Sequence, residues 1–211
     1  GRSQVPISKP ANGKRNDSRA KPRGGVFLGG PLSAMLLSLC FFEGSGILER
    51  TIPWFGLLPL LISLGRHRYS LKWRLLHGLF FGLITCCWQL QTANGEFFTP
   101  SAALLETAVA ILLVTGSWML FCSTGGWFFR HPSPLAVLPG LAVLWTGIEL
   151  LRTEWIPMAM PWFQLGQAIK PASPEACSAA VIGLSGLGFI ICLVNCAFYL
   201  ALKNKRGRVQ L

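Results

Sequence analysis

The sequence predicts an all-α membrane protein with about six transmembrane helices and a disordered basic N-terminal tail. Of the 211 residues, 52% are hydrophobic and only 13% are charged, whereas a soluble domain carries roughly 25% charged residues. The apolar residues are gathered into long runs, and these runs lack the alternation of polar and apolar residues that a membrane β-strand shows. Because a bilayer core offers no water to the backbone, such runs should be helices.

Basic stretches lie at both ends of the chain. Residues 1–25 contain seven of the 19 Lys and Arg and no large apolar run, which predicts a disordered tail. Residues 203–211 form a second basic tail. Beside a membrane segment, such tails mark the cytoplasmic side rather than a nucleic-acid partner.

Between the tails, residues 26–202 are expected to form one polytopic transmembrane domain. The second apolar run is short for a span of about 20 residues and is interrupted by Pro59, so a tilted or re-entrant helix is an alternative to a full span there. The six runs cover residues 26–48, 52–65, 69–92, 101–129, 134–151 and 177–202.

The distribution of basic residues predicts the orientation. If all six runs cross the membrane and the N-terminus is cytoplasmic, 16 of the 19 Lys and Arg lie on the inner side. Only Arg50, Arg152 and Lys170 then lie outside, as the preference of cationic loops for the cytoplasm requires. Both termini are therefore expected to be cytoplasmic, with outer loops near residues 43–52, 93–100 and 152–176.

The motifs that carry chemistry in other proteins are weak here. Gly183-x-Ser185-Gly186 is similar to the nucleophile motif of rhomboid proteases, but all three histidines precede Ser185 and lie near the predicted cytoplasmic side. Close helix packing through small residues is the favoured reading of that stretch. The seven cysteines show neither CxxC nor a zinc-binding spacing, and no phosphate-binding loop or dinucleotide motif occurs. We therefore expect no metal and no cofactor.

The segment 145–167 is unusual because it carries charges and several tryptophans between two apolar runs. Glu149 and Arg152 are three residues apart, so they share a helix face and are expected to pair. Two interpretations stay open at this point: a structural ion pair at a helix end, or a polar pocket that faces outward.

The same segment resembles the bacterial apolipoprotein N-acyltransferases. Trp145-x-x-x-Glu149-Leu-Leu-Arg152, followed by Pro161-Trp162-Phe163-Gln164-Leu165-Gly166, is similar to the central motif of that family. The run that carries Trp88 and the run after the motif also match, so the resemblance covers residues 30–202. Departures from the family pattern occur at Ala159, Met160 and Gln167.

The resemblance implies a function. In the family, an acyl chain moves from a phospholipid to the amino-terminal cysteine of a diacylated lipoprotein, in the bacterial inner membrane. The chemistry resides in a carbon–nitrogen-hydrolase domain with a Glu, Lys and Cys triad, which is expected to be absent from this chain. No catalytic residue is therefore assigned, and the helices are expected to position acyl chains.

The implied partners are phospholipid, a diacylated lipoprotein and a carbon–nitrogen-hydrolase domain in cis or in trans. The tryptophans of the segment, Trp145 among them, are expected at the membrane interface. The candidates for an outer substrate rim are Trp88, Trp145, Glu149, Arg152, Pro161, Trp162, Gln164 and Gly166.

Two alternatives remain. The chain could be a non-enzymatic membrane scaffold derived from the family, or a small unrelated transporter. A transporter of this kind is expected to show interrupted helices in two repeated halves, and the sequence shows no such repeat.

Overall fold

The computed structural model of the chain describes residues 28–40, 50–92, 103–131, 133–155, 164–169 and 173–209. Within these ranges all regular structure is helical. Four short helical turns are η2 (Ile52–Trp54), the π-helical η3 (Leu151–Trp155), η4 (Leu165–Ala168) and η5 (Pro174–Ser178). The α-helices are α1 (Gly29–Leu39), α3 (Leu58–Arg66), α4 (Leu71–Thr92), α5 (Ala103–Phe128), α6 (Pro134–Leu150) and α7 (Ala179–Val209).

The predicted helical class is confirmed, and each of the six apolar runs contains one of these α-helices. The predicted tail at residues 1–25 lies outside the described part of the chain. At the other end, α7 continues to Val209 and so crosses the expected boundary at residue 202. Lysine and arginine are good helix formers, and they let the helix extend beyond its apolar part.

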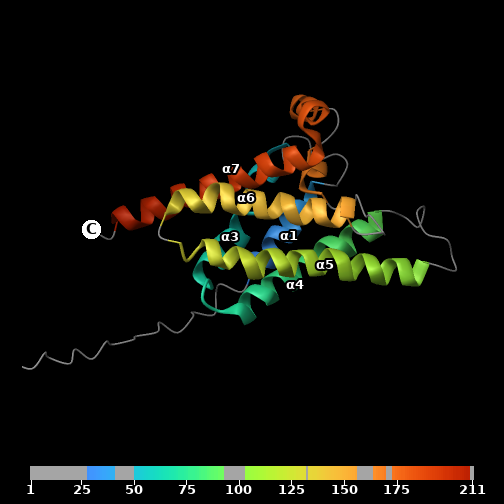
Figure 1. Cartoon of the computed structure of the whole chain (residues 1–211), viewed down its shortest axis with the longest axis horizontal. Helices are drawn as coiled ribbons and strands as arrows, with labels where there is room; N and C mark the ends of the chain where they lie inside the picture. The colour runs from blue at the N-terminus through green and yellow to red at the C-terminus, as the bar shows by residue number, and fades with distance from the viewer. Residues whose placement is uncertain are drawn as a thin grey trace, which may run out of the picture.

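The helices form a bundle in which α5, α6 and α7 run along the long axis of the molecule (Figure 1). Helix α4 packs along α5, α6 packs along α7, and α1 lies against both α3 and α4. Within the described residues, three helical segments are long and apolar enough to cross a membrane: Thr107–Phe128, Ala136–Glu154 and Pro174–Asn204. The α1 helix and the Ile52–Arg66 segment are apolar but shorter.

The bundle exposes apolar side chains and buries polar ones. Leu112 on α5, Val143 on α6 and Val181 on α7 are 72%, 61% and 86% exposed. Ser33 and Asn195, in contrast, are completely buried. Polar groups that bond between helices inside the bundle, with apolar residues facing outward, are typical of proteins surrounded by lipid. The long apolar helices and this distribution together indicate a membrane location.

Helices α4 and α5 approach each other closely through two glycines. A Cβ atom added to Gly78 would lie 2.6 Å from the Cα of Met119, and one added to Gly82 would lie 2.6 Å from the Cα of Thr115. Gly78 and Gly82 are four residues apart, which is the spacing that lets two membrane helices come into backbone contact. Larger side chains at either position would push α4 and α5 apart.

The second apolar run is broken into two pieces, η2 and α3, separated by a turn at residues 55–57. Pro59 lies in the first turn of α3, where the missing N–H of proline costs nothing, so it begins this helix instead of interrupting one. The break leaves backbone groups without helical partners. In an apolar surround these groups need partners within the protein.

Asn195 on α7 supplies two of those partners. Its Oδ1 accepts a hydrogen bond from the Leu57 N–H at 3.0 Å. Its Nδ2 donates to the carbonyl oxygens of Pro53 and Ile191, each at 2.9 Å. In addition, the Oγ of Ser33 on α1 accepts from the Leu60 N–H at 2.9 Å. One buried amide therefore ties the broken segment to the longest helix.

Helix α7 is itself interrupted near its start. Gly183 has φ +73°, a left-handed conformation that glycine adopts without the steric cost of a Cβ atom. The segment before this break, η5 and the first residues of α7, stands away from the rest of the bundle (Figure 1).

We expect Asn195→Leu to lower the free energy of unfolding by about 2 kcal/mol, because the Leu57 N–H then stays buried without an acceptor. For a chain of this size the loss corresponds to a fall in melting temperature of roughly 4–8 °C, which thermal unfolding in detergent can measure. The control is Asn204→Leu, the same change at an exposed position of α7. Equal melting temperatures for the two variants would contradict this role of Asn195.

Candidate functional site

The site is built around the carboxyl group of Glu149, in the last turn of α6. Glu149 is only 4% exposed. Its Oε1 accepts a hydrogen bond from the Leu165 N–H at 2.6 Å. Leu165 is the first residue of η4, and the residue before it, Gln164, gives that turn no side-chain cap. A carboxyl group from another helix thus satisfies a backbone N–H that starts a helical turn.

Two glycines let η4 lie directly against α7 beside this carboxyl group. A Cβ atom on Gly188 would be 3.0 Å from the Oε2 of Glu149 and 3.4 Å from the Gly166 N. A Cβ atom on Gly166 would collide with the carbonyl oxygen of Leu184. The end of α6, the turn η4 and helix α7 therefore meet with no side chain between them at these positions. We call this meeting point beside the Glu149 carboxyl group the Glu149 junction.

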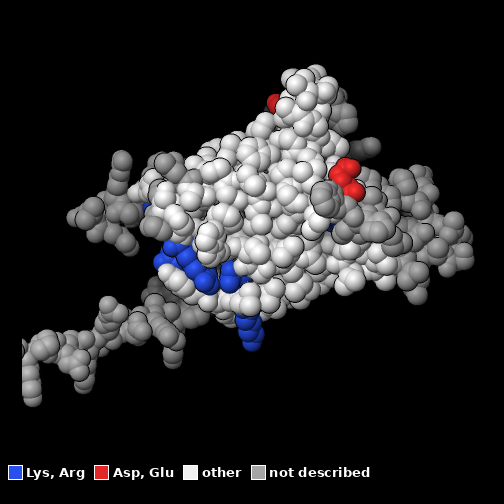
Figure 2. All heavy atoms as spheres, viewed as in Figure 1, with Lys and Arg blue, Asp and Glu red and all other residues white. Residues whose placement is uncertain are grey.

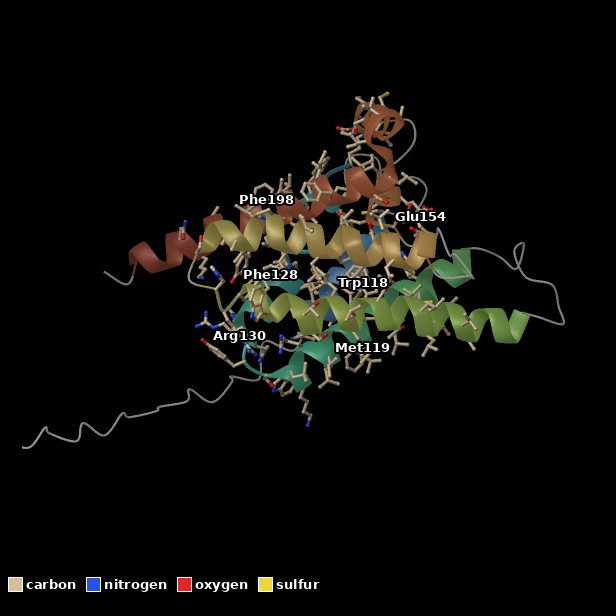
Figure 3. All side chains as sticks on the ribbon, in the orientation of Figure 1. Trp118, Met119, Phe128, Arg130, Glu154 and Phe198 are labelled. Carbon is tan, nitrogen blue, oxygen red and sulfur yellow. The ribbon has the colours of Figure 1, made fainter. Side chains whose placement is uncertain are left out.

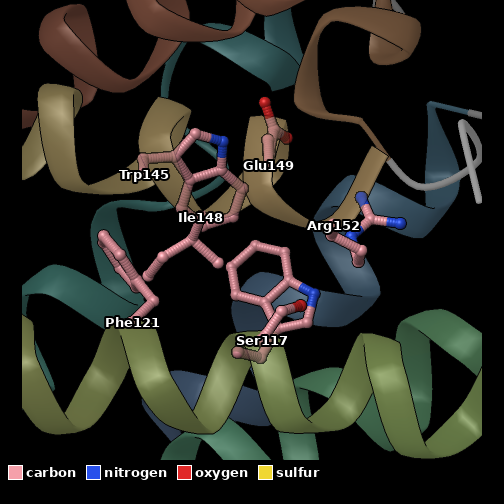
Figure 4. A pocket seen from close by; sticks show the side chains of 7 residues that line it. Ser117, Phe121, Trp145, Ile148, Glu149 and Arg152 are labelled. Carbon is pink, nitrogen blue, oxygen red and sulfur yellow. The ribbon is translucent and has the colours of Figure 1, made fainter. Parts of the chain in front are cut away.

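Trp145 lies one turn before Glu149 and points into the bundle. It is 4% exposed, and its ring centroid lies 4.1 Å from that of Trp118 and 4.9 Å from that of Phe121. The expected position at the membrane interface is therefore wrong for Trp145, which is a core residue between α5 and α6. In Figure 4 its indole nitrogen points toward Glu149, without forming a standard hydrogen bond.

Arg152 is also buried, at 4% exposed, and lies in the π-helical turn η3 that follows α6. The expected direct pairing with Glu149 is not formed. Oε1 of Glu149 accepts a hydrogen bond from the Leu165 N–H, and Oε2 accepts no hydrogen bond. Figure 4 shows that the carboxyl group of Glu149 and the guanidinium group of Arg152 point in different directions.

A small cavity lies between α5 and α6 at this position. Its volume is about 10 Å³, which is about the space that a single water molecule needs. An acyl chain does not fit into it. The lining residues are Ser117, Trp118, Phe121, Trp145, Ile148, Glu149 and Arg152.

The structure brings together five of the eight sequence candidates: Trp145, Glu149, Arg152, Gln164 and Gly166. Trp88 lies half-buried toward the end of α4. The remaining two candidates, Pro161 and Trp162, lie outside the described residues.

Sequence reasoning missed two residues of the site around Glu149, namely Leu165 and Trp118. Leu165 takes part through its backbone N–H, which no side-chain pattern reveals. Trp118 reads in the sequence as one more apolar residue of a long run. For Gly188 the expectation of close packing through small residues is confirmed, because Gly188 faces η4 and Glu149.

The protease-like motif gains no support from the arrangement of the helices. Ser185 lies in the first third of α7, whereas His67 follows α3 and forms a ring contact with His77 near the start of α4. His131 lies in the connection between α5 and α6, where Arg130 bonds to the same connection that carries His67. Among the described His, Cys, Asp and Glu side chains, no group of three could hold a metal ion.

Comparison with known proteins identifies the family. Residues 33–197 match the model of the apolipoprotein N-acyltransferase N-terminal domain. The chain belongs to this family. The matched range begins in α1 and ends in α7, so it contains all the described residues of the Glu149 junction.

Two curated apolipoprotein N-acyltransferases are similar to this member of the family. The protein of Nitrosomonas europaea is 33% identical over 111 residues, which are 51% of this chain and 21% of the relative. The protein of Geobacter metallireducens is 25% identical over 182 residues, which are 84% of this chain and 33% of the relative. The chain therefore spans about a fifth to a third of the curated relatives that it matches.

We expect Glu149→Ala to release η4 from the junction, because the Leu165 N–H loses its acceptor. Hydrogen–deuterium exchange of a peptide containing Leu165 should become about tenfold faster. Glu149→Gln should keep the protection, because an amide oxygen is also an acceptor.

The matched control is Glu154→Ala, which removes an exposed carboxyl group from the same stretch of chain. Unchanged exchange in Glu149→Ala would show that η4 is held by packing alone.

Proposed function

We propose that this chain is the membrane part of an apolipoprotein N-acyltransferase in the bacterial inner membrane. In this role it positions the acyl chains of a phospholipid and a diacylated lipoprotein for N-acylation. The observation that carries the proposal is the Glu149–Leu165 contact within the matched range. It holds the turn that contains the last residues of the family-like motif against the end of the membrane helices.

The proposed orientation has six crossings with both termini in the cytoplasm. Its support is the separation of charge along the bundle. Arg130, between α5 and α6, and Glu154, after α6, lie toward opposite ends in Figure 3. Figure 2 shows Lys and Arg side chains gathered at the end where α7 finishes, and Asp and Glu side chains elsewhere. Cationic ends on the cytoplasmic side are the rule for membrane proteins.

The acyl chains would lie outside the bundle, since the cavity beside Glu149 holds no more than about one water molecule. Apolar side chains are exposed at the same end of the molecule. Leu150 and Leu151, at the end of α6, are 39% and 47% exposed, and Leu184 on α7 is 41% exposed. These residues flank the junction of α6, η4 and α7, so a lipid tail that lies against them would bring its ester group near the junction.

In this proposal the described residues hold substrates and do not form or break bonds. Acyl transfer needs an activated nucleophile with a base. The buried cysteines serve the packing: Cys192, for example, lies in the core, with its sulfur 3.8 Å from the Leu141 carbonyl oxygen. By the family resemblance, the Glu, Lys and Cys groups come from a hydrolase domain in cis or in trans. The membrane part contributes proximity and orientation.

The orientation predicts which thiols are accessible from outside the cell. Cys177, in η5, is exposed. In a variant that keeps Cys177 and lacks the other six cysteines, an impermeant thiol reagent should label intact cells. A second variant that carries Lys203→Cys and no native cysteine should react only after the cells are opened. Labelling of position 203 in intact cells would exclude the proposed orientation.

The acylation role can be tested by joining the chain to the carbon–nitrogen-hydrolase domain of a related N-acyltransferase. The chimera should transfer an acyl group from phospholipid to a diacylated lipopeptide. In Glu149→Ala the rate of acyl transfer should fall by at least about tenfold, because a small displacement of the bound substrates slows the transfer strongly.

Glu149→Gln should stay close to the unsubstituted chimera, and Glu154→Ala serves as the exposed control. Membrane abundance is measured in parallel for each variant. A chimera that is abundant but inactive would refute the role, as would full activity in Glu149→Ala.

A further inference from the structure

A second and larger cavity lies at the opposite end of the bundle from Glu149, between α3 and α7. Its volume is about 190 Å³, far above the roughly 10–15 Å³ that one water molecule needs. It is lined by Ile62, Gly65, Arg66, Arg68, Tyr199, Leu202 and Lys203. Three of these seven residues are cationic and none is acidic.

The shape of this cavity depends on a close contact between α3 and α7. A Cβ atom on Gly65 would collide with the hydroxyl group of Tyr199, so the hydroxyl lies at the wall of the cavity. The ring of Tyr199 is held from the other side by Phe129, with ring centroids 5.2 Å apart. The cavity therefore has a fixed hydroxyl group beside its three cations.

The positive charge around the cavity has no described counter-ion. The acidic side chains that the structure describes are Glu149, Glu154 and Glu175, which lie at or beyond the other end of α6 and before α7. More cations lie nearby. The guanidinium carbons of Arg68 and Arg130 are 4.9 Å and 5.4 Å from the centroid of the same Tyr69 ring. Several positive charges in one region repel one another, and an anion bound in the cavity would relieve the repulsion.

Helix ends do not cancel this charge. Arg66 is in the last turn of α3, whose C-terminus carries roughly half a negative charge. Three full positive charges from Arg66, Arg68 and Lys203 exceed that value. The cluster is therefore more than the usual basic cap of a single helix.

The cavity also continues into an apolar surface. Leu202 lines it and is 43% exposed, and Phe198, four residues earlier on the same face of α7, is 49% exposed. A ligand held by the cations would thus lie beside a track of apolar side chains that faces outward from the bundle. A free inorganic anion has no use for such a track, whereas a phospholipid has both parts.

From these features we infer that the cavity between α3 and α7 binds the phosphate group of an anionic phospholipid, whose acyl chain lies along Leu202 and Phe198. Basic pockets between membrane helices on the cytoplasmic side bind lipid headgroups of this kind in other proteins. This lipid is distinct from the acyl donor of the proposed reaction, which would lie at the Glu149 end. The inference concerns binding alone, and its test does not depend on acyl transfer.

The test uses the full chain purified in a neutral detergent at an ionic strength of about 0.15 M, where exposed charges are screened beyond roughly 8 Å. Binding of phosphatidylglycerol is measured by native mass spectrometry, with phosphatidylcholine as the zwitterionic comparison. The double variant Arg66→Gln/Lys203→Gln should bind phosphatidylglycerol at least about tenfold more weakly, since each basic residue near a membrane contributes roughly a fivefold attraction for anionic lipid. The charge-preserving variant Arg66→Lys/Lys203→Arg should bind it within about twofold of the unsubstituted chain.

The control is Lys72→Gln, which removes an exposed positive charge from the same end but outside the cavity. It should change binding by no more than about twofold, because screened charges outside the cavity act weakly. An equal loss in the control would overturn the inference, because it would mean diffuse attraction to the whole basic end. Displacement of the lipid by millimolar inorganic phosphate would also overturn it, in favour of a site for a soluble anion. Equal affinity for phosphatidylcholine would do the same.

Discussion

Within an apolar surround, a backbone N–H that leaves a helix must be bonded to another part of the protein. Buried side chains meet this requirement at two irregular places of the bundle. Asn195 on α7 holds the break between η2 and α3, and Glu149 on α6 holds the start of η4. In both cases the bond joins residues that are far apart in the sequence. The long helices therefore fix the irregular segments. They also fix the position of the surface beside α6, η4 and α7 that is proposed to hold the substrates.

The helices were predictable because their signal is local: each long apolar run forms a helix wherever lipid surrounds it. The break after Trp54 was less visible, since its stability comes from Asn195, over 130 residues later. At the candidate site, the sequence predicted a pair of Glu149 and Arg152 on one face at a helix end, and the structure has them in the last turn of α6 and in the π-helical turn after it. The spacing did not predict that the carboxyl group of Glu149 accepts a hydrogen bond from the backbone N–H of Leu165. Trp145 shows a further limit, because a tryptophan suits both an interface and a core.

The two ends of the bundle have different chemistry. At one end, buried polar groups leave a cavity of about 10 Å³, so this end is nearly solid and offers its outer apolar surface. At the other end, cations surround a space of about 190 Å³. The polar groups at the first end are buried within the bundle, whereas the cations at the second end line an open cavity.

The left-handed residue Gly183 gives α7 an uneven stiffness. A continuous helix transmits bending through its hydrogen-bonded ladder, but the ladder is interrupted where φ is +73°. The short arm before Gly183 carries the strongly exposed Val181, whereas the long arm after it carries Gly188 and Asn195. A force applied to the short arm by any neighbouring body turns that arm about Gly183. The contacts of Glu149 and of the break between η2 and α3 are made with the long arm, beside Gly188 and through Asn195.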